Sequence, residues 1–490
     1  MTGNEDARTY GHWIDGADYN GSGLIPRANP ATTIHVANFA DGTAADVAEA
    51  VAAAKRAFDS GSWSRLSGAE RSRVLLRLVD WIRENREFLA KIDAQEVGKP
   101  LALARGDVDG AIAHFEYAAA LAHEVHGDAY TNMGEAYLGL ITREPVGVVG
   151  LIAPWNFPAL SYAEKVAYAL AAGCTAVIKP SEFTSGSTIE ISRAATMAGL
   201  PDGVINVVTG YGHVVGQAIV EHPDVNFVSF TGSTVTGRKI AETAASRLKK
   251  VALELGGKGA NIVFADANLD DAVDGALFAA FFNSGECCVA GSRLLVQDEI
   301  ADEFLARLAA ATERMTVGFE EHADVGAMIH EQHAERVVDF IDEAVQAGGK
   351  VLAGGRRVTP LSGPGAFVEP TVVDNVTPDM RIFRDEIFGP VLTATRFTDA
   401  DEALRLANDT VYGLGNSVWT KDLDKAMRFQ RELRSGTVWI NTTIDGGAQM
   451  TFGGTKESGY GREVGRAGLE EFTELKSCVI RTGERAPSFG

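Results

Sequence analysis

Two neighbouring cysteines, Cys287 and Cys288, lie at the centre of a segment rich in small residues. An apolar run that ends at Phe282 precedes them, and Gly285 and Gly291 flank them. A buried structural cysteine rarely needs glycine on both sides. A thiol that must meet a substrate and a cofactor does, because bulky neighbours would block the approach. The pattern therefore predicts a nucleophilic cysteine.

A carboxylate occurs in a similar setting upstream. Glu254 ends an apolar, strand-like run and is followed by Leu255 and two glycines. A thiol nucleophile together with a carboxylate base predicts covalent catalysis. A cysteine hydrolase without redox chemistry is an alternative, but it needs a histidine partner, and none of the ten histidines lies in a motif-like context.

Asn156 follows the first strand of an α/β pattern and stands between Pro154 and Pro158. Two prolines fix the turn, so the Asn156 amide is held in place and could donate to a carbonyl oxygen that gains charge. The alternative is an asparagine that bonds the backbone of its own turn.

The glycine fingerprint of dinucleotide binding is missing from the first strand–helix turn, and Gly210, Gly212 and Gly216 are spaced one residue too widely for it. The segment 230–234, which opens a helix, offers backbone N–H groups and hydroxyls suited to a pyrophosphate. A simple Ser/Thr helix cap is the alternative there.

Lys179 and Glu182 follow the second strand and could hold an adenosine ribose. An acid at this position repels a 2′-phosphate, which favours NAD over NADP. The alternative is a solvated charge pair in a turn.

Five apolar runs alternate with helical segments in the first half of the chain, which predicts a doubly wound parallel sheet. The runs are Val146–Ile152, Ala176–Ile178, Val204–Val208, Phe227–Phe230 and Val251–Leu255, and the helices between them are Ala159–Ala171, Ser187–Ala198, Val214–Glu221 and Thr236–Ala245. A second β/α series runs from Asn261 to about Thr437. Helices are also expected at Ala44–Phe58, Ala69–Glu96 and Leu101–Glu124, a strand at Tyr137–Thr142 and a last strand at Thr473–Arg481.

The composition excludes several classes of protein. A formal net charge of −21 over 490 residues argues against nucleic-acid and anionic-membrane partners. No window approaches a membrane span, the N-terminus lacks an apolar signal region, and four cysteines do not make a disulfide framework. We expect a cytoplasmic enzyme of two or three domains without a metal site.

Taken together, the motifs resemble the NAD(P)-dependent aldehyde dehydrogenase superfamily from about Trp13 to Ile480. The matching segments occur in the family's order: 154–158, 179–182, 230–234, 254–258, 285–292, 386–390 and 452–459. The resemblance implies an α/β fold with a Rossmann-like NAD-binding domain (residues 1–126 and 146–256) and an α/β catalytic domain (257–457). It also implies a β-strand oligomerisation arm with a C-terminal segment (127–145 and 458–490), and a homodimer or homotetramer.

The resemblance assigns roles residue by residue. Cys288 is the nucleophile, Glu254 the base that activates water, and Asn156 with the Cys288 N–H the oxyanion hole. Lys179 is placed with both the catalytic and the cofactor residues, and a low thiol pKa should make Cys288 the first target of iodoacetamide. The other cofactor residues implied are Ile152, Trp155, Ser181, Glu182, Gly212, Gly216, Phe230, Gly232, Ser233, Leu255, Glu386 and Phe388.

The resemblance also locates the aldehyde site, at Phe157, Leu160, Glu164, Phe282 and Phe452. Three phenylalanines make an apolar throat. Glu164 stands where many relatives carry a large aromatic residue, so a cationic or hydroxylated aldehyde is one interpretation and an exposed bystander glutamate the other. Glu286 replaces the glutamine usual in relatives. A catalytically silent structural or binding protein is the remaining alternative, against which intact Cys288, Glu254 and Asn156 argue.

Overall fold

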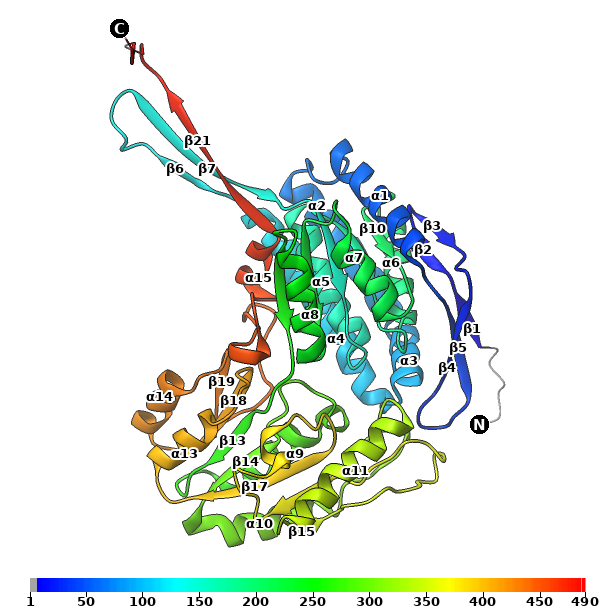
Figure 1. The fold of residues 1–490 in the computed structure, drawn as a ribbon, viewed down its shortest axis with the longest axis vertical. Coiled ribbons are helices and arrows are strands. Elements are labelled where there is room, and N and C mark those ends of the chain that lie inside the picture. The colour runs from blue at the N-terminus through cyan, green and yellow to red at the C-terminus, as the bar shows by residue number, and fades with distance from the viewer. Residues whose placement is uncertain (1–6, 486, 490) are drawn as a thin grey trace.

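The computed structural model describes residues 7–485 and 487–489, and it contains two large sheets and two small ones. The first large sheet has eight strands in the order β20-β12-β11-β8-β9-β10-β2-β3 (Figure 1). Its five central strands are parallel and coincide with the five predicted apolar runs, which confirms that prediction. These strands are β8 (Val148–Ile152), β9 (Thr175–Lys179), β10 (Ile205–Val207), β11 (Phe227–Thr231) and β12 (Lys250–Glu254).

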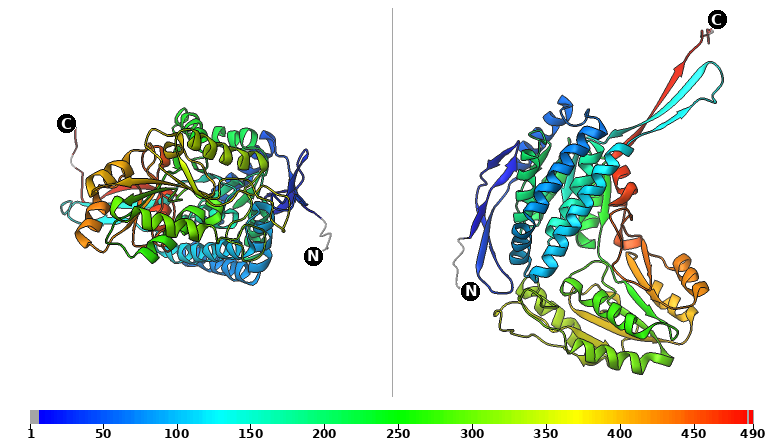
Figure 2. Two further views of the ribbon diagram at one scale, coloured as in Figure 1. Left: turned by 90° about the horizontal axis from the view of Figure 1, so that it is seen from below. Right: turned by 180° about the vertical axis from the view of Figure 1, so that it is seen from behind.

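Helices cover both faces of this sheet, because its central strands are apolar on both sides. One face carries α1 (Ala44–Ser60), α7 (Gln217–Glu221) and α8 (Thr234–Ala245). The other carries α5 (Pro158–Ala172) and α6 (Gly186–Met197). Beyond these two helices lies an outer layer, seen from behind in Figure 2, formed by α2 (Gly68–Glu84), α3 (Arg86–Val97) and α4 (Leu101–Leu121).

Two predicted helices differ in detail. The single helix expected over 69–96 is wrong: the chain breaks at Asn85, which leaves the α-helical region and donates its side-chain amide to the Trp81 carbonyl at 2.9 Å. The helix expected at Val214 begins instead with a π-helical turn, Gly212–Gly216, before α7. Apolar periodicity continues across both sites, so it could not locate either change.

The second large sheet has seven strands in the order β15-β16-β17-β14-β13-β18-β19, all parallel except β15. Successive residues alternate between its faces: Leu294 and Val296 pack with α9 and α10, whereas Leu295 packs with α11. The strands are β13 (Ala260–Val263), β14 (Arg293–Gln297), β15 (Lys350–Ala353), β16 (Thr371–Asp374), β17 (Val391–Phe397), β18 (Gly415–Trp419) and β19 (Thr437–Ile440). The helices are α9 (Leu269–Phe281), α10 (Asp298–Thr312), α11 (Glu331–Gln346), α12 (Arg381–Arg384), α13 (Ala400–Asn408) and α14 (Leu423–Glu432).

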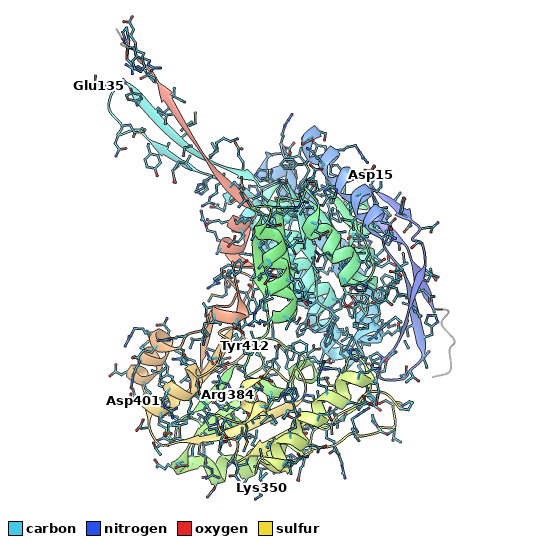
Figure 3. All side chains as sticks on the ribbon, viewed as in Figure 1. Asp15, Glu135, Lys350, Arg384, Asp401 and Tyr412 are labelled. Atoms are coloured by element: carbon cyan, nitrogen blue, oxygen red, sulfur yellow. The ribbon has the colours of Figure 1, made fainter. Side chains whose placement is uncertain are left out.

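A three-stranded antiparallel arm projects from the body of the molecule (Figure 1). The expected last strand, β21 (Thr473–Arg481), pairs along its whole length with β7 (Tyr137–Pro145), and β6 (Asp128–Tyr130) completes the arm. Glu135 marks its tip in Figure 3. The C-terminal residues before β21 do not lie in the arm. The strand β20 (Gly459–Tyr460) joins the first sheet beside β12, and the helix α15 (Gly465–Glu471) packs on α5.

The chain enters the first sheet through short strands at its N-terminal end. The hairpin of β2 (His12–Ile14) and β3 (Ala17–Tyr19) adds antiparallel strands to its edge. The second small sheet pairs β5 (His35–Ala40) with β1 (Arg8–Tyr10) and β4 (Leu24–Ala28). No helix among the described residues is long and apolar enough to cross a membrane.

Candidate active site

The nucleophile loop and the strand that carries Glu254 meet where the two large sheets approach each other. Glu254 is the last residue of β12, and the chain then passes through Gly257 against the Cys288 backbone. A β-carbon at Gly257 would overlap the Cys288 carbonyl oxygen, so only glycine allows this approach. The predicted thiol and carboxylate are thus brought together.

Three consecutive left-handed residues shape the nucleophile loop. Asn283, Ser284 and Gly285 have φ values of 51°, 60° and 70°. Such a run is costly for residues other than glycine and persists only where contacts hold it. The Ser284 hydroxyl accepts from the Gly326 N–H at 2.9 Å, and the Asn283 amide donates to the carbonyls of Asn156 and Glu286, both at 3.1 Å.

Asn156 is fixed by contacts with distant segments. Its side-chain amide donates to the Glu286 carbonyl at 2.9 Å, and its own carbonyl accepts from the Lys99 ammonium at 2.7 Å. The alternative, an amide bonded to its own turn, is therefore not what the structure contains. An amide has two N–H groups, so the second remains for a ligand oxygen.

Glu254 is buried without a partner among the described residues. The residue is 2% exposed, and neither carboxylate oxygen has a hydrogen bond. Burial raises the pKa of Glu254 well above its ordinary value, and nearby Glu463 raises it further, while Lys165 opposes the shift. Lys165 is itself paired with Glu463, and both bond the Ser229 hydroxyl. A carboxyl with a raised pKa can take and return a proton near neutral pH.

The expectation of a low thiol pKa at Cys288 is wrong for this structure. The hydrogen bond to the Cys287 thiol, burial, and the nearby carboxyls of Glu386 and Glu254 all raise the pKa of Cys288 above its ordinary value. The glycines and cysteines of the local motif predict an accessible thiol. They cannot predict its pKa, because the carboxyls that raise it come from other segments of the chain. Cys288 nonetheless keeps partial exposure, whereas Cys174 is fully buried.

The predicted ribose residues lie together at the carboxyl end of β9. The Lys179 ammonium donates to the Pro180 carbonyl at 2.7 Å and lies 3.2 Å from Glu182. β-Carbons at Gly212 and Gly216 would contact only the Lys179 side chain and Ile152, so the glycines leave open space beside this pair. An acid, a base and a glycine-lined space fit the ribose of a dinucleotide.

Ser233 caps α8, accepting from the Thr236 N–H at 3.3 Å, so the helix-cap interpretation is correct. The cap leaves a helix N-terminus that can also receive an anion. Behind it, Leu255 packs on Gly237, and the Phe230 ring covers Gly232. Ser181 is buried and caps the following turn at Phe183.

The nicotinamide-side residues occupy one turn that faces the nucleophile loop. Glu386 accepts from the Gly257 N–H at 2.9 Å, and burial raises its pKa to about 7. Phe388 packs edge-on against Trp155, with ring centroids 5.5 Å apart. Tyr412, which Figure 3 labels at the junction between the sheets, lies near Glu386, and burial raises its pKa to about 12.

The apolar throat forms around Cys288 as the sequence indicates. Phe157 and Phe282 stack at 5.8 Å, and Phe452 packs in the same cluster. Sequence reasoning missed three members, Leu414, Trp439 and Ile444, because nothing in their local pattern distinguishes them from core residues. Leu160 and Glu164 lie outside this cluster, farther along α5: Leu160 faces Gly110 on α4, and the half-buried Glu164 carboxylate lies 3.8 Å from the His114 ring.

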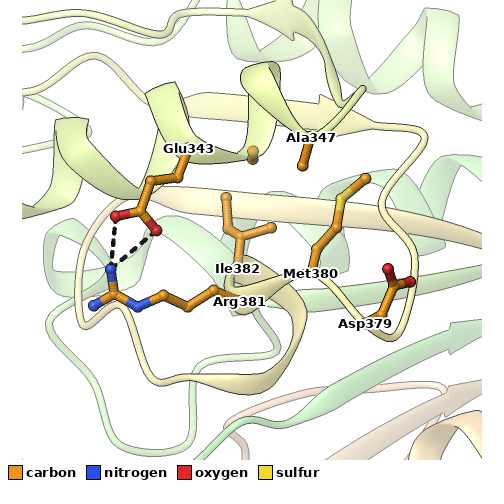
Figure 4. Close-up of a pocket in the computed structure, with 7 residues that line it drawn as sticks. Glu343, Ala347, Asp379, Met380, Arg381 and Ile382 are labelled. Atoms are coloured by element: carbon orange, nitrogen blue, oxygen red, sulfur yellow. Dashed lines mark hydrogen bonds and ion pairs between the residues drawn. The ribbon is translucent and has the colours of Figure 1, made fainter.

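A hollow on the second sheet unit lies apart from this site (Figure 4). It is lined by α11 and residues 379–382, with an ion pair between Glu343 and Arg381 at 2.9 Å. No predicted site residue lines it. The described residues also contain no cluster of three or more groups that could hold a metal ion.

The fold and the site define a cysteine-dependent oxidoreductase with a dinucleotide-binding sheet. The aldehyde dehydrogenase family model matches residues 13–478, and the chain belongs to that family. It is an NAD-dependent aldehyde dehydrogenase. It is 44% identical to betaine aldehyde dehydrogenase of Bacillus subtilis (strain 168) over 96% of each chain. It is 42% identical to the peroxisomal aminoaldehyde dehydrogenase 1 of Pisum sativum over 94% of this chain and 93% of the relative.

A solved structure extends the comparison to three dimensions. The NAD-dependent aldehyde dehydrogenase from Sinorhizobium meliloti superposes with a TM-score of 0.97 at 45% identity. The match covers 99% of this chain and 98% of that one. The α/β fold is therefore that of aldehyde dehydrogenases, as the sequence predicts.

Proposed function

We propose that Cys288 is the nucleophile of aldehyde oxidation and that Glu254 activates the hydrolytic water. The observation that carries this proposal is the contact at Gly257, which presses the Cys288 backbone against the segment that follows Glu254. An unpartnered, buried carboxyl beside a partly exposed thiol has no structural purpose of its own.

The proposed reaction follows from these groups. The Cys288 thiol gives up its proton to solvent water, and its sulfur bonds the aldehyde carbon while the carbonyl π pair moves onto the oxygen, where the second N–H of Asn156 and the Cys288 N–H stabilise the oxyanion. NAD supplies the hydride acceptor for the oxidation that follows. Glu254 then takes a proton from water, whose oxygen attacks the thioester carbon and releases the carboxylate and the thiol.

We assign the cofactor to the glycine-lined space at β9 and the turn at Glu386. Lys179 and Glu182 would hold the adenosine ribose, Ser233 and the Trp155 region would face the pyrophosphate, and Glu386 and Phe388 would position the nicotinamide side. In the free protein, burial raises the pKa of Glu386 to about 7, so its ionised carboxylate lacks enough hydrogen-bond donors. The hydroxyls of a bound ribose would supply such donors, which supports this role.

The aldehyde is proposed to be cationic, with Glu164 as the selecting group. Leu160 and Glu164 are four residues apart in α5 and so share one face of that helix, which begins directly after Phe157. The Glu164 side chain is 29% exposed. Burial and the neighbouring Glu463 raise its pKa to about 8, so its charge develops as the pH rises through that value. The Bacillus subtilis and Pisum sativum relatives described above are named for betaine aldehyde and aminoaldehyde, which carry a cationic nitrogen.

The test is NADH formation at 340 nm with cationic, hydroxylated, aliphatic and aromatic aldehydes. We expect kcat/KM to be highest for the cationic ones and to rise further between pH 7 and pH 9. Glu164→Gln should lower that preference about tenfold while leaving apolar aldehydes unaffected, because one charge pair near a half-buried site is worth about 1–2 kcal/mol. A preference unchanged by Glu164→Gln makes the glutamate a bystander, and the absence of all turnover favours the catalytically silent alternative.

We also propose that the enzyme is cytoplasmic and forms a homodimer or homotetramer. Its four cysteines are all free, which fits a reducing compartment. The arm gives a surface for a second copy of the chain, because both faces of its thin sheet expose apolar side chains.

A further inference from the structure

His333, which no motif singles out, lies against the turn that carries Phe388. It belongs to the first turn of α11, is 3% exposed, and its ring packs against those of both Trp155 and Phe388 at centroid distances of 6.4 Å. The residue next to Trp155 is Asn156. The histidine therefore touches the cofactor side of the site from an element that supplies none of the predicted residues.

The hydrogen-bond partners of His333 fix its tautomer. Its Nε2 lies 2.6 Å from the Phe388 carbonyl oxygen, which can only accept, so Nε2 carries the hydrogen. Its Nδ1 lies 2.6 Å from the Arg336 guanidinium, which can only donate, so Nδ1 presents its lone pair. Burial lowers the pKa of His333 to about 4, which agrees with a neutral ring.

The backbone that receives this hydrogen bond is strained. Phe388 has φ 56°, a left-handed conformation that is unfavourable for a bulky residue. Among the described residues, His333 is the one donor to its carbonyl. The adjoining Gly389 packs so closely on Gly285 of the nucleophile loop that a β-carbon at Gly285 would overlap the Gly389 carbonyl. A relaxation of Phe388 would therefore disturb both the cofactor turn and the nucleophile loop.

We propose that His333 is a positioning residue for the cofactor: its Nε2–H holds the left-handed backbone of Phe388, and thereby the Phe388 ring against Trp155. This inference rests on the proposed cofactor role of Phe388. His333 itself takes no part in the chemistry.

The test compares His333→Leu, which removes the donor, with His333→Gln, whose amide N–H can replace Nε2–H. We expect His333→Leu to raise the KM for NAD about tenfold with little change in kcat. The variant leaves the buried Phe388 carbonyl without a donor, and the loss of one such hydrogen bond weakens binding about tenfold. His333→Gln should restore the KM to near the wild-type value. Ile341→Val, a core change on the same helix, should lower the melting temperature and leave the KM for NAD unchanged.

Two results would overturn the inference: a wild-type KM for NAD in His333→Leu, or a KM in His333→Gln as high as in His333→Leu. Phe388→Ala separates this failure from failure of the proposed function. If Phe388→Ala raises the KM and His333→Leu does not, only the positioning role is lost. If neither raises it, the cofactor role of Phe388 is lost too. The double variant should show no further increase over Phe388→Ala, since both changes act through one ring.

Discussion

At the scale of single residues, the active site depends on groups whose protonation is set by their neighbours. Glu254 is buried beside Glu463, and Cys288 lies between Cys287 and two carboxyls. Both pKa values are raised, which favours the protonated form of each group in the free protein. Ionisation of Glu254 is required for it to act as a base, so we expect the rate of thioester hydrolysis to increase with pH.

Glu254→Gln tests this role directly. The variant should produce one rapid equivalent of NADH per subunit and then stop, because acylation of Cys288 does not need the carboxylate whereas hydrolysis does. Stopped-flow absorbance at 340 nm measures the burst. The wild-type steady-state rate should rise with pH as Glu254 ionises, and it should do so at higher pH than for an ordinary glutamate. Steady turnover by Glu254→Gln at the wild-type rate would assign the base elsewhere.

Glu182 tests the proposed ribose site. Glu182→Gln keeps the size of the side chain and removes the charge that repels a 2′-phosphate. We expect the KM for NAD to rise and the preference for NAD over NADP to narrow about tenfold, as expected for the loss of a charge-assisted hydrogen bond. Steady-state kinetics with both cofactors measure the change. The control is Glu221→Gln, at an exposed glutamate that ends α7. Equal preferences for NAD over NADP in the wild type and both variants would exclude Glu182 from the ribose site.

At the scale of elements, close backbone contacts set the geometry that side chains then use. Gly256 and Gly257 connect β12 to β13, and β-carbons there would overlap Glu386 and the Cys288 carbonyl respectively. The loop after β12 therefore brings together the base, the nucleophile and the nicotinamide-side turn. The glycines were visible in the sequence, but the segments they must accommodate were not.

Gly257→Ala should displace the Cys288 loop. We expect kcat to fall about 100-fold, the order that a 1 Å misplacement of a reacting group costs. Gly106→Ala is the matched control, because a β-carbon there meets nothing within 4 Å in an exposed part of α4. It should raise stability by about 0.5–1 kcal/mol without changing kcat. Thermal unfolding and kcat are measured on both variants, and an unchanged kcat in Gly257→Ala would contradict the argument.

At the scale of the whole molecule, the arm is the part that a single copy of the chain cannot bury. Leu475 and Val479 on β21 are each 62% exposed and lie on the same face of the strand. Apolar side chains in an isolated thin sheet gain stability only when another surface covers them.

A double substitution, Leu475→Asp with Val479→Asp, should therefore convert the oligomer into a monomer, because two charges would be buried without partners. Light scattering after size-exclusion chromatography measures the mass. Leu361→Asp, at a fully exposed position in a loop of the body, is the control and should leave the mass unchanged. A monomeric wild-type protein, or an oligomer that survives the double substitution, would exclude the arm as the interface.

The sequence by itself determined the five parallel strands, the aldehyde dehydrogenase family and the last strand at Thr473–Arg481, because apolar periodicity and short motifs are local patterns. It did not determine the break at Asn85, where the periodicity runs on without interruption. The predicted nucleophile, base and oxyanion amide share one site in the structure, although their separate motifs could not show the distances between them.

Only the tertiary structure decided the raised pKa of Cys288, the partners of Asn156, and the contact between His333 and Phe388. Each depends on groups from segments that are far apart in the chain. Burial and electrostatic interaction are properties of position in space, and a linear pattern contains neither. The candidate residues could therefore be named from the sequence, whereas their contacts and the directions of their pKa shifts follow from the fold.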